Sequence, residues 1–225
     1  MKKKFILLIS AISVLVCMSV HAFGFTDVSG GDTILHSAIE DLCKFDIVDG
    51  YEDNTFRPDN LVTRAEMSEF CRRLLPPHVK SANVFDVRKQ FYDMNSEHWA
   101  ADSMGIMIDM GYMQGYGDDT IKPDANVTLG EASAILSRML GYEIKAKELG
   151  GYPNGYLSVM NELGIIDDLK DVKEDEFLTR SMVAMMLQKT LDAPMLMMNG
   201  YDLNNGGTYV QDKNHTYRNL LINYK

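Results

Sequence analysis

Residues 51–66 read YEDNTFRPDNLVTRAE, and this stretch decides most of the fold. Near its end, Thr63 and Glu66 have the spacing of a capping box, in which side chain and backbone bond reciprocally at the start of a helix. Upstream, Asp53 favours a turn and Pro58 favours an extended arm. Apolar residues then recur with helical spacing at Met67, Phe70, Cys71, Leu74 and Leu75. The stretch therefore predicts a turn, an arm, a cap and an amphipathic helix.

The same pattern returns twice along the chain. Residues 116–131 read YGDDTIKPDANVTLGE, and apolar residues follow Thr128 at the same five offsets. A third, weaker copy starts at Thr179, where Arg180 follows the threonine but Met182 stands in place of the glutamate. One such unit cannot bury its apolar face alone. Three units therefore predict a stack around one core.

We predict a mainly α-helical chain of three tandem helix–turn–arm–helix repeats. The expected boundaries are 23–76 for repeat 1, 77–90 for a linker, 91–142 for repeat 2, 143–194 for a degenerate repeat 3 and 195–225 for a tail. The linker is opened by a Pro-Pro pair, and the tail receives no fold or role. Gly50 and Gly115 precede the turns, and we expect both to adopt positive φ.

Residues 1–22 have the features of a secretory signal peptide, with three lysines, an apolar run and a small-x-small site that ends at Ala22. The alternative is a retained anchor helix, which the shortness of the apolar run disfavours. Cleavage takes the basic residues from 22 to 19 against 32 acidic residues, so the net charge becomes −13. This balance argues against nucleic acid as a partner. After cleavage we expect a secreted protein with no membrane partner.

Other kinds of chemistry find little support in the residue pattern. Cys43 and Cys71 fall on the two predicted helices of repeat 1, where a disulfide is conceivable but two buried apolar thiols are favoured. The histidines and the Asp-rich turns lack the ligand spacing of a metal site. The sequence shows no nucleophile elbow and no Gly-rich phosphate loop. We therefore expect a non-enzymatic protein without cofactor or metal.

The order Phe-x-Asp, helix, Gly-Tyr-x-Asp-x-Thr-Phe-x-Pro and Val-Thr-Arg-Ala-Glu closely resembles the S-layer homology (SLH) repeat. The first copy, which begins near Phe25, follows the pattern closely, and the second begins near Phe91. The resemblance implies a pseudo-threefold helical domain with ligand grooves between neighbouring repeats. It also implies binding of secondary cell-wall polysaccharide on Gram-positive bacteria, often through a terminal pyruvylated sugar.

The resemblance places the arginine of Thr-Arg-Ala-Glu at the ligand's carboxylate, a role that falls to Arg64 and, in the degenerate repeat, to Arg180. A cation at the first helical position opposes the helix macrodipole. Arg64 is better explained if an anion meets it together with free backbone N–H groups of the helix. The alternative is an ion pair with Asp53 or Asp59. In repeat 2, Leu129 replaces the arginine, and Lys122 is the nearby cation that could substitute for it.

The predicted glycan-binding residues are Arg64, Thr63, Tyr51, Asp53, Trp99, Tyr116, Lys122 and Arg180. Trp99 fits either stacking on a sugar face or packing between repeats, and packing is favoured for an aromatic residue on a helix face. Tyr51 and Tyr116 fit either the lining of a groove or a packed turn.

The leading hypothesis is an exported, non-catalytic protein of the cell wall or cell surface. It attaches to anionic, pyruvylated secondary cell-wall polysaccharide or to another peptidoglycan-linked glycan. The alternative is a degenerate structural module that assembles with other surface-layer proteins and binds glycan weakly. A third interpretation, in which the tail serves a wall hydrolase, is disfavoured because residues 195–225 are too short for a catalytic domain.

Overall fold

The computed structural model describes residues 24–28, 33–80, 90–95, 97–202 and 206–223. The helices are α1 (Thr33–Lys44), α2 (Arg64–Leu74), α3 (Pro77–Lys80), α4 (Ala101–Asp109), α5 (Leu129–Met139), α6 (Glu143–Glu148), α7 (Asn154–Glu162), α8 (Arg180–Asp192) and α9 (Tyr217–Asn223). A one-turn 3-10 helix covers Asp167–Leu169, and the strands are β1 (Met195–Asp202) and β2 (Gly206–Asp212). The prediction of a mainly helical protein is confirmed.

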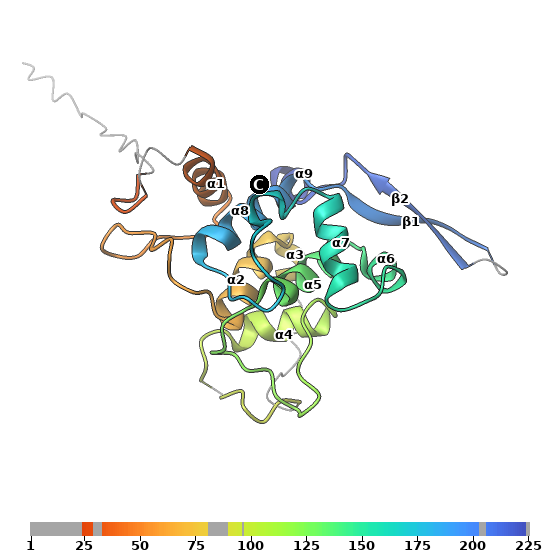
Figure 1. Ribbon diagram of the computed structural model, residues 1–225, viewed down its shortest axis with the longest axis horizontal. Coiled ribbons are helices and arrows are strands. Elements are labelled where there is room, and N and C mark those ends of the chain that lie inside the picture. Colours follow the sequence, from red (N-terminus) through yellow and green to blue (C-terminus); the bar gives the residue numbers. More distant parts are fainter. Residues whose placement is uncertain (1–23, 29–32, 81–89, 96, 203–205, 224–225) are drawn as a thin grey trace, which may run out of the picture.

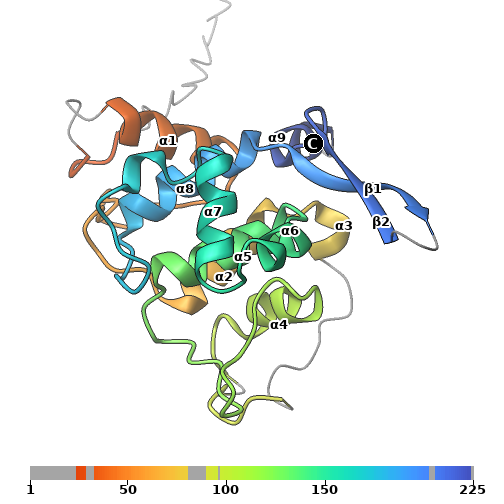
Figure 2. The same cartoon turned by 45° about the vertical axis from the view of Figure 1, so that its right-hand side comes forward.

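Helices of different units pair with one another. The second helix of the first unit, α2, packs on α4 of the second unit, and α5 packs on α7 of the third unit. The second helix of the third unit, α8, packs back on α1 of the first, and the two lie together in Figures 1 and 2. Each apolar face is thus covered by the next unit, so one continuous core joins all three units.

The turn before each arm departs from the expected backbone geometry. Neither Gly50 nor Gly115 has positive φ; that conformation occurs instead at Asn54 and Arg57, and at the matching Asp119 and Lys122 of the second unit. Glycine is required at both positions because a phenylalanine ring occupies the space that a Cβ atom would take. A Cβ on Gly50 would lie 2.0 Å from the Phe25 ring, and a Cβ on Gly115 would lie 2.1 Å from the Phe91 ring.

The tail forms an antiparallel hairpin and a helix that the sequence pattern did not indicate. In the hairpin, Met195 pairs with Asp212, and the register shifts between Met198 and Gly200. The hairpin extends away from the helical body (Figure 2). Helix α9 returns to the core, where the buried Tyr217 hydroxyl donates to the carbonyl of Met139.

Several other expectations meet the structure in part. Residues 1–22, the predicted signal peptide, lie outside the described residues, and the predicted linker contains α3 before it also leaves the described range. Helix α6 was not expected. The thiols of Cys43 and Cys71 are free, so the two cysteines form no disulfide. Cys71 is buried as the favoured interpretation expected, whereas Cys43 is half-buried. None of the helices in the described ranges has the length and apolar composition that crossing a bilayer requires.

Candidate functional site

The capping threonines lie where neighbouring units meet. The backbone N–H groups of Arg64 and Ala65 donate to the carbonyls of Ala125 and Pro123, both at 2.9 Å, on the arm of the second unit. Equivalent pairs of bonds join the other units: Leu129 to Glu176 and Gly130 to Glu174, then Arg180 to Asn60 and Ser181 to Pro58. The three helix starts and the three arms therefore form a closed ring of backbone hydrogen bonds.

This ring corrects one expectation about anion binding. The first N–H groups of α2 were expected to be free for a ligand, but Arg64 and Ala65 use theirs on the neighbouring arm. The N–H of Glu66 donates to the hydroxyl of Thr63, and the N–H of Thr63 donates to the Glu66 carboxylate, which completes the predicted capping box. Any anion at this junction must therefore be held by side chains.

Arg64 is 3% exposed and reaches from α2 into the second unit. Its Nε donates to the carbonyl of Ile121 at 2.9 Å, and its Nη2 donates to the carbonyl of Gln114 at 2.8 Å. Its Nη1 lies 3.1 Å from Oε1 of Glu131. The ion-pair partner is thus Glu131 of the next unit. The alternative pairing with Asp53 or Asp59 is wrong, because Arg64 makes its contacts in the second unit. The Asp53 carboxylate binds Arg57 and Thr55 within its own turn.

The Arg64 guanidinium lines a cavity of about 220 Å³ between the first and second units. We call this the Arg64 cleft; its walls are formed by Arg64, Met113, Gln114, Gly115, Tyr116, Glu131, Ala134, Ile135, Arg138 and Tyr152. An arginine carries five N–H donors, and three of them are accounted for by Ile121, Gln114 and Glu131. A cationic donor at the edge of an aromatic-walled cavity can bind a carboxylate.

Tyr116 forms one wall of the Arg64 cleft, which confirms the groove-lining interpretation of this residue. Its ring lies 4.8 Å from the Arg64 guanidinium and 4.0 Å from Nζ of Lys122. Its hydroxyl donates to Glu131. Burial and this hydrogen bond raise the pKa of Tyr116 to about 12, so its hydroxyl stays protonated at neutral pH.

Lys122 was expected to compensate for Leu129, and the structure contradicts this. Lys122 lies over Tyr116 at the Arg64 cleft, between the first and second units. Leu129 lies in a different cleft, between the second and third units, whose cation is Lys170. The cleft at Leu129 thus has no arginine at the helix start.

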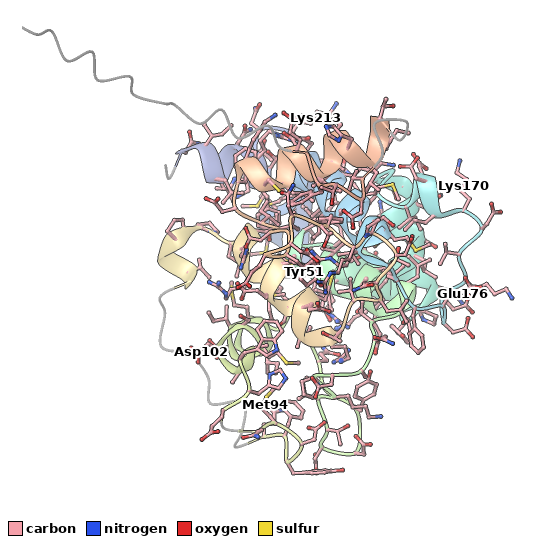
Figure 3. All side chains as sticks on the ribbon, turned by 90° about the vertical axis from the view of Figure 1, so that its left-hand side faces the viewer. Tyr51, Met94, Asp102, Lys170, Glu176 and Lys213 are labelled. Carbon is pink, nitrogen blue, oxygen red and sulfur yellow. The ribbon has the colours of Figure 1, made fainter. Side chains whose placement is uncertain are left out.

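Arg180 lines an equivalent cleft between the third and first units. It is 5% exposed, and its guanidinium donates to the carbonyls of Phe56 and Asp49 at 2.9 and 3.0 Å. We call this the Arg180 cleft; its lining residues are Asp49, Gly50, Tyr51, Glu66, Glu69, Phe70, Arg73, Trp99 and Arg180. Tyr51 lies near the middle of the helical body in Figure 3, with its ring 5.1 Å from the Arg180 guanidinium.

Trp99 does not pack in the core. Its side chain is 61% exposed at the mouth of the Arg180 cleft and is stacked on His98, with the ring centroids 5.8 Å apart. The favoured packing interpretation is therefore wrong, and the indole is available to a ligand. Asp53 lines neither of the two arginine clefts, and Thr63 serves as the helix cap.

Arg73, Glu131 and Arg138 line the two arginine clefts but were missed by the sequence reasoning. A signal for them existed: the tenth residue after each capping threonine is basic, namely Arg73, Arg138 and Lys189. This offset falls outside the apolar face that guided the helix prediction. Glu131 was assigned to the cap alone, although its second oxygen faces Arg64.

Comparison with known proteins matches parts of the first two units to a known domain. Two stretches match the S-layer homology domain. They are residues 24–68 and 90–133, so the third SLH repeat stays a prediction. Both matched stretches end five residues beyond a capping threonine, within α2 and α5.

Several relatives of the chain are surface proteins. The chain is 30% identical to a cell surface protein of Thermoanaerobacter kivui over 172 residues. The matched region covers 76% of this chain and 22% of the relative. The chain is 33% identical over 103 residues to a cellulosome-anchoring protein of Acetivibrio thermocellus, covering 46% of this chain and 23% of the relative. A surface layer protein of Brevibacillus choshinensis is 26% identical over 65% of the chain and 13% of the relative. The chain thus spans less than a quarter of the length of these relatives.

Proposed function

We propose that this chain is a non-catalytic module that attaches to the cell wall by binding an anionic wall polymer. The SLH matches and the surface proteins among the relatives support a place on the cell surface. The three units form a pseudo-threefold ring in this proposal, which the cyclic backbone bonds at the helix starts support.

The observation that carries the proposal is the position of Arg64. Its guanidinium is buried at the wall of a cleft that also contains Tyr116 and Tyr152. A guanidinium can hold a carboxylate with two parallel hydrogen bonds, and a tyrosine ring can pack on the apolar face of a sugar. A pyruvylated sugar offers both groups. Arg180, with Tyr51 and Trp99, provides a second candidate cleft of the same design.

The test is sedimentation of the mature protein with purified cell walls, with and without chemical removal of the secondary polymer. We expect the protein to bind intact walls and to lose binding on stripped walls. Arg64→Gln should weaken binding about tenfold or more, because a charge-assisted hydrogen bond contributes about 1.5–3 kcal/mol. Lys213→Gln removes an exposed charge that lines neither arginine cleft and serves as the control. Equal binding to intact and stripped walls would overturn the proposal.

A second candidate function is a structural module that joins other surface proteins and binds glycan weakly. Leu129 favours it, because this residue removes the arginine from the cleft between the second and third units. Self-association in light scattering, together with no sedimentation on intact walls, would support this function over the first.

A further inference from the structure

The two arginine clefts share one design. Each combines the arginine after a capping threonine with a tyrosine and a second arginine of the following unit: Tyr116 and Arg138 join Arg64, and Tyr51 and Arg73 join Arg180. Arg138 and Arg73 both stand ten positions after their capping threonines. The clefts differ at the first arginine, where Arg64 pairs with Glu131 and Arg180 donates to two carbonyls, and they differ again in the residues around the second arginine.

Arg138 is held loosely for a buried cation. Its side chain is 10% exposed, and its Nη atoms donate at 3.3 Å to neutral acceptors: the carbonyl of Tyr112, Oε1 of Gln114 and the hydroxyl of Tyr156. Its Nε has no hydrogen-bond partner and lies 3.5 Å from a carboxylate oxygen of Glu143. A buried charge whose hydrogen bonds and ion pair are all long is only partly compensated, so this guanidinium is well placed to meet an anion in the cleft.

Arg73 is held tightly by carboxylates. Its Nη1 lies 2.5 Å from Asp49, and its Nε lies 2.7 Å from Glu69. Burial alone would raise the pKa of Glu69, but hydrogen bonds from Arg72, Ser103 and Arg73 outweigh it and lower the pKa to about 2. Glu69 therefore stays ionised at neutral pH, and its negative charge compensates the positive charge of Arg73.

The balance of charged lining residues differs accordingly. The Arg180 cleft has two arginines against three acidic residues, Asp49, Glu66 and Glu69. The Arg64 cleft has two arginines against Glu131 alone among its lining residues. A site with a cationic excess attracts an anion, and a site with an anionic excess repels it.

We propose that Arg138 is a second anion contact, which makes the Arg64 cleft the carboxylate site, while the carboxylates of the Arg180 cleft close that cleft to anions. This inference deepens the proposed function and rests on it. Arg64 and Arg138 both line this cleft, so both guanidinium groups can contact the ligand's carboxylate. The Arg180 cleft, with the exposed Trp99 at its mouth, is left to uncharged sugar units of the same polymer.

The experiment compares two matched variants, Arg138→Gln and Arg73→Gln, in quantitative sedimentation of the mature protein with purified walls. Both variants remove one arginine from the same position of a unit. We expect Arg138→Gln to weaken binding about tenfold or more and Arg73→Gln to change it by less than about twofold. Thermal melting of both variants, and Arg138→Lys as a charge-preserving variant, separate a loss of ligand contact from a loss of fold.

A second arm tests the chemistry of the ligand. Amidation of the wall carboxylates with a neutral amine should abolish the difference between wild type and Arg138→Gln. Undiminished binding to amidated walls would overturn the carboxylate assignment. If wild type binds intact walls and folded Arg138→Gln binds equally well, this inference fails while the proposed function stands. If wild type does not bind intact walls, the proposed function itself fails.

Discussion

At the scale of single residues, the aspartate of each Phe-x-Asp pattern binds the backbone of a turn that lies about 30 positions later in the chain. The carboxylate of Asp27 accepts from the N–H groups of Phe56 and Arg57, both at 2.7 Å. Asp93 makes the same two bonds in the second unit, to Ile121 and Lys122. Arg57 and Lys122 have positive φ, which is strained for residues with a Cβ. The carboxylate bonds therefore stabilise a backbone conformation that the side chains themselves disfavour.

The close approach of a phenylalanine ring to each glycine leads to a stability prediction. Gly115→Ala should destabilise the protein by about 1–3 kcal/mol, because the new methyl group would meet the Phe91 ring and the backbone carbonyl of Thr120. Gly117→Ala is the matched control, since a Cβ there meets nothing within 4 Å, and it should stay within about 0.5 kcal/mol. Urea unfolding of both variants provides the measurement. Equal midpoints would show that the turn adapts without cost.

At the scale of elements, the three helix starts differ in the completeness of their caps. Helices α2 and α5 both have reciprocal capping boxes, formed by Thr63 with Glu66 and by Thr128 with Glu131. Helix α8 has half of this arrangement: the hydroxyl of Thr179 accepts from the N–H of Met182 at 3.4 Å. The third unit therefore lacks the reciprocal half of the capping box at the start of its second helix.

This difference predicts unequal effects of removing the threonines. Thr63→Ala should cost about 1–2 kcal/mol, because it removes a well-formed cap from a half-buried position. Thr179→Ala should cost less, about 0.5–1 kcal/mol, because its hydrogen bond is long. The free energies of unfolding, measured with urea at neutral pH, test this order. A larger loss for Thr179→Ala would contradict it.

At the scale of the whole molecule, stability depends on closing the ring of units. The first helix, α1, buries Leu35, Ile39 and Leu42, and its main helical partner is α8 of the third unit. The arm of the first unit also accepts the N–H groups of Arg180 and Ser181. The two units that match the SLH domain are therefore completed by a third unit that does not.

A truncated chain covering residues 24–142 should accordingly fail to fold cooperatively. Without α8, the apolar face of α1 is exposed, and without α7, the face of α5 is exposed. Circular dichroism during urea unfolding should show a broad transition at lower urea than for residues 24–223. A sharp transition with an unchanged midpoint would show that the first two units suffice.

The sequence by itself determined the repeat, its caps and the helices that follow them, because these depend on spacing along the chain: Thr63 and Glu66 form their box within three residues. It did not indicate α3, α6 or α9. It also indicated that Arg64 and Arg180 are exceptional, since a cation at a helix start conflicts with the helix dipole. Tertiary structure decided what surrounds them. Glu131 meets Arg64 across 67 positions, and the N–H groups expected to be free are bound by the next arm. Such contacts depend on how the units close into a ring, and local spacing carries no information about that closure.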